Sequence, residues 1–117
     1  MALSFEKCVQ ILKAHLTPEE LNRGVGYAAE TPIPAGERLR FPRIDIEVPW
    51  PAYLGFVDRQ PGANWAHSCR YILISRDTGD VASYEARFPP FHTGKDIHWR
   101  MVYKAKGVPD SALEAGP

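Results

Sequence analysis

Two side chains with chemistry of their own, His67 and Cys69, lie two residues apart in the chain. On a strand such neighbours share one face, roughly 6.5–7 Å apart. A thiol beside an imidazole is the core of a nucleophilic dyad, because the base favours formation of the thiolate. This spacing is usually too long for a direct hydrogen bond, so His92 or His98 is an alternative base, and Asn64 could orient the imidazole. The predicted catalytic set is Cys69, His67, Asn64 and His92.

The same residues permit two other interpretations. His67, Cys69 and a third histidine would supply three zinc ligands, but the spacing His-x-Cys is not a strong zinc pattern and the chain has no Cys-x-x-Cys pair. We therefore predict no metal site and no cofactor. In the simplest interpretation Cys69 is a core residue and His67 is satisfied by the backbone. Whether the protein is an enzyme stays open.

A second set of candidates could contact a partner protein. Trp50 and Trp65 border loops rich in proline and glycine, and Pro90 and Phe91 belong to a Pro-Pro-Phe segment. Aromatic residues held at the edges of stiff loops are typical of protein-binding surfaces. Aromatic residues at strand spacing also serve as core. The predicted partner-binding residues are Trp50, Trp65, Pro90 and Phe91.

Composition excludes some classes of partner. Lys plus Arg and Asp plus Glu both number 14, so the basic excess of a nucleic-acid binder is missing. The apolar N-terminal run carries Glu6, Lys7 and Lys13, which argues against a signal peptide or a membrane span. We expect no membrane partner and a cytoplasmic location, where Cys8 and Cys69 would be free thiols. The oligomeric state is not predicted.

Two helical segments are expected at the start of the chain. Ser4 can cap a helix over residues 4 to 16, whose apolar residues recur at three- and four-residue steps. Thr17 and Glu20 then form a capping box that opens a short helical turn. Residues 24 to 37 are predicted to be a loop that crosses to the sheet.

The strands are centred on a hairpin in residues 65 to 88. Residues 71 to 74 are apolar on both faces, which indicates a covered central strand, whereas residues 81 to 88 alternate and predict one wet face. The turn Asp77-Thr78-Gly79-Asp80 joins them, with Gly79 free to take a positive φ. Further strand signals begin near Leu39 and lie in residues 44 to 48, 53 to 57 and 97 to 104.

This order predicts an α+β fold, with an N-terminal helix and a short helical turn packed on a four- to five-stranded antiparallel sheet. The element order resembles that of cystatin-like folds. With the turn Asp77-Thr78-Gly79-Asp80 it is also similar to small bacterial peptidase-propeptide domains. We expect a single domain over residues 1–117, with a loosely ordered tail over 106–117.

The first functional hypothesis is a small soluble protein-interaction module of the inhibitor, immunity or accessory-subunit type. It would bind a polypeptide through loop-edge aromatic residues and an exposed sheet edge. The alternative is a Cys/His-based enzyme or metal site centred on Cys69 and His67. A second alternative is a small-molecule binder that uses the concave face of the sheet.

Overall fold

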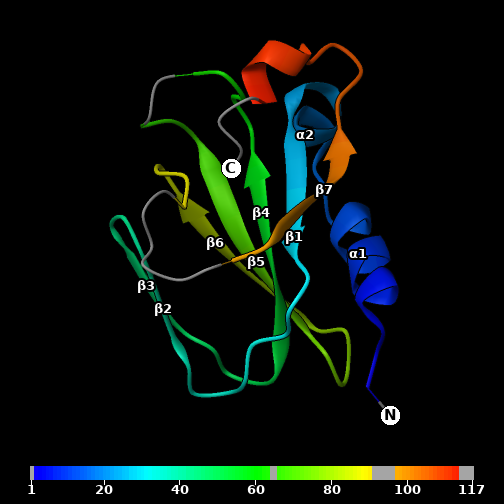
Figure 1. The fold of residues 1–117 in the computed structure, drawn as a ribbon, viewed down its shortest axis with the longest axis vertical. Coiled ribbons are helices and arrows are strands. Elements are labelled where there is room, and N and C mark those ends of the chain that lie inside the picture. Colours follow the sequence, from blue (N-terminus) through cyan, green and yellow to red (C-terminus); the bar gives the residue numbers. More distant parts are fainter. Residues whose placement is uncertain (1, 64–65, 91–96, 114–117) are drawn as a thin grey trace.

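The computed structural model describes residues 2–63, 66–90 and 97–113. Its helices are α1 (Phe5–Ala14) and α2 (Pro18–Arg23), followed near the C-terminus by the 3-10 helix η1 (Asp110–Leu113) (Figure 1). The strands are β1 (Val25–Ala29), β2 (Arg38–Phe41), β3 (Ile44–Glu47), β4 (Ala52–Asp58), β5 (Cys69–Ser75), β6 (Val81–Ala86) and β7 (Trp99–Lys104). No helix in these described ranges is long and apolar enough to cross a membrane.

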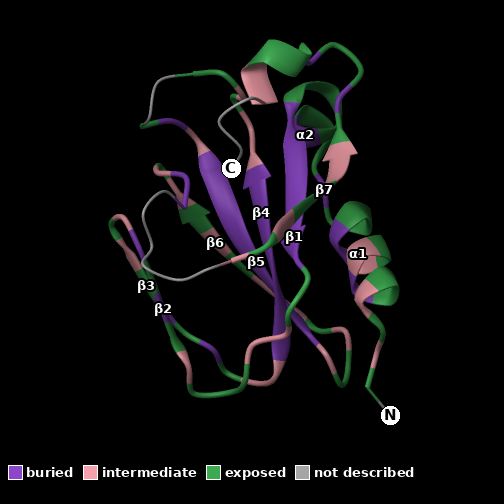
Figure 2. Ribbon diagram, viewed as in Figure 1, coloured by how far each residue is buried: buried purple, intermediate pink, exposed green. Residues whose placement is uncertain are grey.

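The main sheet has five antiparallel strands in the order β6-β5-β4-β1-β7. The helix α1 covers one face, and a separate ribbon of β2 and β3 covers the other (Figure 1). The central strands β1, β4 and β5 are buried along almost their whole length (Figure 2). The predicted α+β class, with an N-terminal helix and a short helical turn on an antiparallel sheet, is confirmed.

The first helix docks through its predicted apolar stripe. Its cap forms as expected, since the Lys7 N–H donates to Ser4 Oγ at 3.1 Å. Cys8 and Leu12 are the residues of α1 that are fully buried against the sheet. Beneath them Gly55 lies in β4, where an added Cβ would stand 2.3 Å from Leu12 Cδ1. Glycine at this position therefore lets the helix approach the sheet closely.

The prediction that residues 24 to 37 form a loop was wrong for its first part. Val25–Ala29 is the strand β1, which pairs with both β4 and β7 and is buried throughout. The two glycines of Gly24-Val25-Gly26 are residues that usually interrupt helices and strands. In addition, a strand covered on both faces shows no alternation of apolar and polar residues, so the sequence pattern did not indicate a strand. Pairing on both sides overrides the weak local strand propensity of this sequence.

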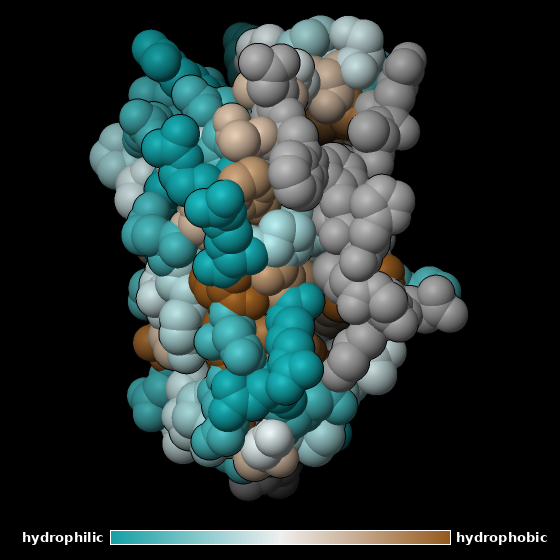
Figure 3. Space-filling model, turned by 90° about the vertical axis from the view of Figure 1, so that its left-hand side faces the viewer, coloured by the Kyte–Doolittle hydropathy of each residue, from teal (hydrophilic) through white to brown (hydrophobic). Residues whose placement is uncertain are grey.

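The strands β2 and β3 form a ribbon of their own. Its inner residues Leu39, Phe41 and Ile46, and Val48 directly after β3, are buried against the sheet. On the outer face Arg38 pairs with Asp45 at 3.1 Å. Seen from the ribbon's side, the coloured surface is largely hydrophilic, with smaller apolar areas between (Figure 3). The ribbon thus covers the second face of β4 and β5 with its apolar side and exposes its polar side to solvent.

The segment that begins at residue 106 contains a buried residue and a short helix. Val108 is buried against the core, and Asp110–Leu113 form η1. Residues 114–117 lie outside the described part of the chain. The loosely ordered tail and the single-domain boundary stay predictions.

Candidate functional site

Cys69 is the first residue of β5, opposite Asp58 of β4 on one side and Ala86 of β6 on the other. Its side chain is fully buried. Burial, reinforced by the negative charge of Asp58, raises the pKa of Cys69 to about 12. The thiol is therefore held in its protonated form at neutral pH, which is the opposite of an activated nucleophile.

His67 lies just before β5 and is also buried, with 5% of its surface exposed. Its Nε2 lies 2.9 Å from Asp58 Oδ1, and its backbone N–H donates to the Arg87 carbonyl at 2.8 Å. Since Asp58 pairs in register with Cys69, the two side chains share one face of the sheet. The structure thus adds a carboxylate from another strand to His67 and Cys69. The one sequence signal for this carboxylate was that Asp58 is a polar residue at the end of the apolar run of β4.

The other predicted catalytic residues, Asn64 and His92, lie outside the described residues. His98, the alternative base, is exposed just before β7. Within residues 2–63, 66–90 and 97–113, no group of three His, Cys, Asp or Glu residues is arranged to hold a metal ion. A catalytic role for Cys69 and His67 stays a prediction, and both side chains are buried.

We expect Cys69 and Cys8 to resist alkylation in the folded protein. The pKa of Cys8 is also raised, chiefly by burial. At pH 7 a thiol with a pKa of about 12 has a thiolate fraction roughly 1,000-fold below that of a free cysteine. Iodoacetamide labelling between pH 6 and 9, read by mass spectrometry, should therefore modify both thiols only after unfolding. Rapid labelling of Cys69 alone below pH 7 would contradict this and favour the enzyme hypothesis.

Of the predicted partner-binding residues, two are described. Trp50 is half-buried and packs against the core cluster under the ribbon, and Pro90 is buried. Trp65 and Phe91 lie outside the described residues. The partner-binding role of these four residues stays a prediction, and in the described pair the side chains contribute to packing.

A buried ion cluster that the sequence did not reveal ties α2 to the sheet. The carboxylate of Glu20 is fully buried and accepts from Arg59 Nε at 2.9 Å and from Arg70 Nε and Nη2, both at 2.8 Å. Arg59 also donates to both carboxylate oxygens of Glu85, and Arg70 to Ser83 Oγ. Three elements meet here, α2, β5 and β6, together with Arg59, the residue that follows β4. The charged side chains of this cluster bind one another, so the cluster stabilises the packing of α2 on the sheet.

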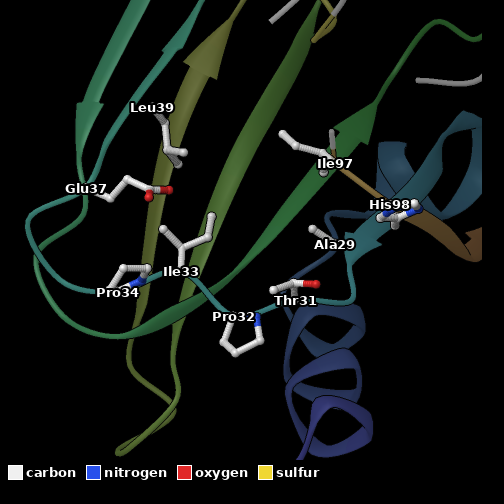
Figure 4. Close-up of a pocket in the computed structure, with 9 residues that line it drawn as sticks. All are labelled: Ala29, Thr31, Pro32, Ile33, Pro34, Glu37, Leu39, Ile97 and His98. Atoms are coloured by element: carbon white, nitrogen blue, oxygen red, sulfur yellow. The ribbon is translucent and has the colours of Figure 1, made fainter. Parts of the chain in front are cut away.

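A small pocket opens between the start of β2, the end of β1 and the residues before β7 (Figure 4). Its volume is about 210 Å³. Ala29, Ile33, Leu39 and Ile97 give it apolar walls, and Glu37 supplies a carboxylate. The ribbon fills the face of the sheet over β4 and β5. The small-molecule hypothesis would therefore apply to this pocket or to a second, larger hollow of about 370 Å³ next to α2 and the residues before η1.

The main sheet has β6 at one edge and β7 at the other. The β7 edge is irregular, since its register with β1 shifts between Gly26 and Tyr27, and it carries Arg100 and Lys104. The β6 edge pairs with β5 in unbroken register from Cys69↔Ala86 to Ile74↔Val81. Bulges and cations are the features by which proteins guard sheet edges, so of these two edges β6 is the less protected.

Comparison of this chain with protein-family models, curated proteins and solved structures found no match.

Proposed function

We propose that this protein is a polypeptide-binding module of the inhibitor, immunity or accessory-subunit type, whose partner adds an extended strand to β6. The observation that carries the proposal is the regular, unguarded edge of β6. Its one charged residue, Glu85, is an anion bound by Arg59 of the same chain, and Val81–Ala86 contains neither a lysine nor an arginine.

The pairing pattern identifies the backbone groups that would bind. Ser75 N–H donates to the Asp80 carbonyl at 2.7 Å, and hydrogen-bonded positions alternate along an antiparallel pair. Ala82, Tyr84 and Ala86 therefore direct their backbone groups toward β5. Val81, Ser83 and Glu85 direct theirs away from the sheet, and in the described part of the chain none of these outward groups makes a backbone hydrogen bond.

Side chains on the helix-covered face hold this edge in place. Ser83 Oγ accepts from Arg70 Nη1 at 3.0 Å, and Glu85 accepts from Arg59. A strand anchored in this way loses little conformational freedom when a partner binds, which favours affinity.

The distribution of exposed apolar side chains favours binding by backbone pairing rather than by a hydrophobic docking patch. Among the described residues the large hydrophobic side chains that are exposed are Leu21 at 42% and Met101 at 47%. Met101 belongs to β7, at the opposite edge of the sheet from β6, and Leu21 belongs to α2. A partner that binds here would gain its affinity mainly from main-chain hydrogen bonds.

Replacing Ser83 by proline should abolish this mode of binding. Proline removes the outward N–H, and its ring stands where a partner strand would approach. Each lost backbone hydrogen bond is worth about 1 kcal/mol, so together with the steric block we expect at least about tenfold weaker binding. Twelve-residue peptides selected by phage display on the wild-type protein are the probe, and their Kd values are measured by fluorescence anisotropy.

Ser83→Ala is the matched control, because it also loses the hydrogen bond to Arg70 but keeps the outward N–H. It should bind the selected peptides as the wild type does, and the Ser83 and Glu85 amides should gain hydrogen-exchange protection on binding. The proposal is overturned if no selected peptide distinguishes Ser83→Pro from Ser83→Ala. It is also overturned if the protein dimerises in sedimentation experiments and Ser83→Pro alone is monomeric, since the edge would then serve self-association.

A further inference from the structure

We infer that the hollow between the end of α2 and the segment before η1 binds a small organic carboxylate. Its volume is about 370 Å³, and its walls come from the end of α2, from the residues after β4 and from Gly107, Val108 and Pro109. The helices α2 and η1 lie at the same end of the molecule (Figure 1). The inference does not depend on the proposed function, because it requires no partner strand at β6.

The walls of the hollow are held by hydrogen bonds and by close packing. Ala105 N–H donates to the Gly24 carbonyl at 2.9 Å, and Val108 N–H donates to the Ala105 carbonyl at 3.1 Å. The segment before η1 is thus fixed against the end of α2. The turn after β4 is fixed as well, because a Cβ added at Gly62 would stand 3.1 Å from Ala112 Cβ of η1. The hollow is therefore preformed, which lowers the entropy lost on binding.

Two arginines line the hollow, and both can donate to a ligand. Arg23, in the last turn of α2, is exposed and makes no side-chain hydrogen bond or ion pair within the described part of the chain. A guanidinium carries five N–H donors. In Arg59 the Nε group donates to Glu20, and Nη1 donates to Ser68 and to Glu85. Its Nη2 donates to Glu85 alone, so one N–H of Arg59 stays available beside the guanidinium of Arg23.

The amide of Gln60 adds another donor to the lining. Its Oε1 accepts from the Ser68 N–H at 3.1 Å, so the NH₂ group is the part of this side chain that is left for a ligand. Among the described residues that line the hollow there is neither Asp nor Glu. Neighbouring carboxylates have partners, since Asp58 accepts from the Gln60 N–H at 2.9 Å. Asp110 likewise pairs with Lys104 at 3.1 Å. The lining therefore suits an anion.

The carbonyl groups at the end of α2 would oppose an anion, but they have donors of their own. The Glu20 carbonyl accepts from the Gly24 N–H at 2.8 Å, and the Leu21 carbonyl accepts from the Tyr103 hydroxyl. The partial negative charge of a helix end is equivalent to about half an elementary charge. The full positive charge of Arg23 outweighs it.

The charge balance at the hollow favours a monoanion. Arg59 belongs to the buried cluster, in which its charge and that of Arg70 are matched by those of Glu20 and Glu85. The uncompensated charge of the lining is therefore the single positive charge of Arg23. A carboxylate matches this charge, whereas a phosphate dianion would exceed it.

The size and the apolar walls of the hollow indicate that the carboxylate has an organic body. The volume lies within the roughly 300–1,000 Å³ of sites that take small molecules. Pro61, Val108 and Pro109 supply apolar surface to the lining. An inorganic anion would leave this surface without contact, whereas an aromatic or aliphatic group would cover it.

The test compares phenylacetate with phenylacetamide, which has the same shape without the charge. Binding to the isotope-labelled full chain at pH 7 is followed by NMR through the backbone amides of Gly107 and Val108 and the Nε–H of Arg23. We expect these signals to shift, and phenylacetate to bind about three- to tenfold more tightly than phenylacetamide. Raising the salt concentration should reduce this preference.

Arg23→Gln should bring the preference for the acid below about twofold. Arg40→Gln, the same charge change at an exposed residue of β2, should leave it intact. Glu85→Gln should have the opposite effect, because it removes the anion that competes for Arg59, and should tighten phenylacetate binding about two- to threefold.

Equal binding of phenylacetate and phenylacetamide, or an unchanged preference in Arg23→Gln, would overturn the inference. Weaker binding of phenylacetate in Glu85→Gln would also overturn it, because the ligand would then not share Arg59 with Glu85. The last comparison uses inorganic phosphate, which we expect to bind more weakly than phenylacetate. Phosphate that binds as tightly would show that the hollow holds an adventitious ion only, and the inference would be wrong.

Discussion

Replacing Glu20 by glutamine is expected to lower the free energy of unfolding by about 3–5 kcal/mol. The carboxylate is fully buried and accepts from the Thr17 N–H, Arg59 and two nitrogens of Arg70. Glutamine would leave Arg70, whose side chain is 9% exposed, as a buried cation without its partner, and would turn an amide NH₂ toward arginine donors. Urea-induced unfolding, followed by tryptophan fluorescence, measures the loss.

Glu85→Gln is the control for this prediction, since it removes a carboxylate from the same cluster. The Glu85 side chain is 68% exposed, so solvent screens its pair with Arg59 and we expect a loss below about 1 kcal/mol. Equal losses in the two variants would show that burial of Glu20 contributes nothing special, which contradicts the prediction.

The pH dependence of stability should distinguish the same two variants from the wild type. Burial by itself would raise the pKa of Glu20, but hydrogen bonds from Arg70, Thr17 and Arg59 outweigh it and hold the pKa below its ordinary value of 4.5. The Arg59 hydrogen bonds likewise lower the pKa of Glu85. A depressed carboxyl pKa contributes stability above its unfolded value and loses it as the pH falls through the folded value. The wild type should therefore lose stability below about pH 4.5, and Glu20→Gln should show a shallower decline.

The parts of the fold that the sequence could predict are those specified by neighbours in the chain. The cap at Ser4, the capping box of Thr17 and Glu20, and the turn at Gly79, whose φ is 81°, are all formed. Each depends on residues within three or four positions. The prediction that residues 71 to 74 are covered on both faces is also confirmed, because β5 is buried throughout.

What the sequence could not predict depends on contacts between distant residues. The bonds from Glu20 to Arg59 and Arg70 span 39 and 50 positions. No local pattern distinguishes these arginines from solvated ones. The same holds for Asp58, which meets His67 and Cys69 only because β4 pairs with β5, and for β1, which is a strand only through its two neighbours. The residue types of the candidate site could thus be identified from the sequence. Their burial and their partners could not, because both depend on how the strands pair in the sheet.

Replacing Tyr71 by alanine is expected to lower the free energy of unfolding by about 3–5 kcal/mol and to loosen the β2–β3 ribbon. The Tyr71 ring is fully buried and stacks on Phe41 of the ribbon, with the ring centroids 4.4 Å apart. It also packs on Phe56, and its hydroxyl donates to the Phe88 carbonyl at 2.9 Å. Alanine would leave a cavity under the ribbon that neighbours on the rigid sheet cannot fill.

The control Tyr71→Phe keeps the ring and removes only the hydroxyl, so it should cost about 1 kcal/mol. Hydrogen exchange supplies the measurement that separates local from global effects. In Tyr71→Ala the amides of β2 and β3 should lose protection before those of β4 and β5, because β2 and β3 form a separate two-stranded sheet that packs on the main sheet through its side chains. Uniform loss of protection, or equal stability of the alanine and phenylalanine variants, would contradict the prediction.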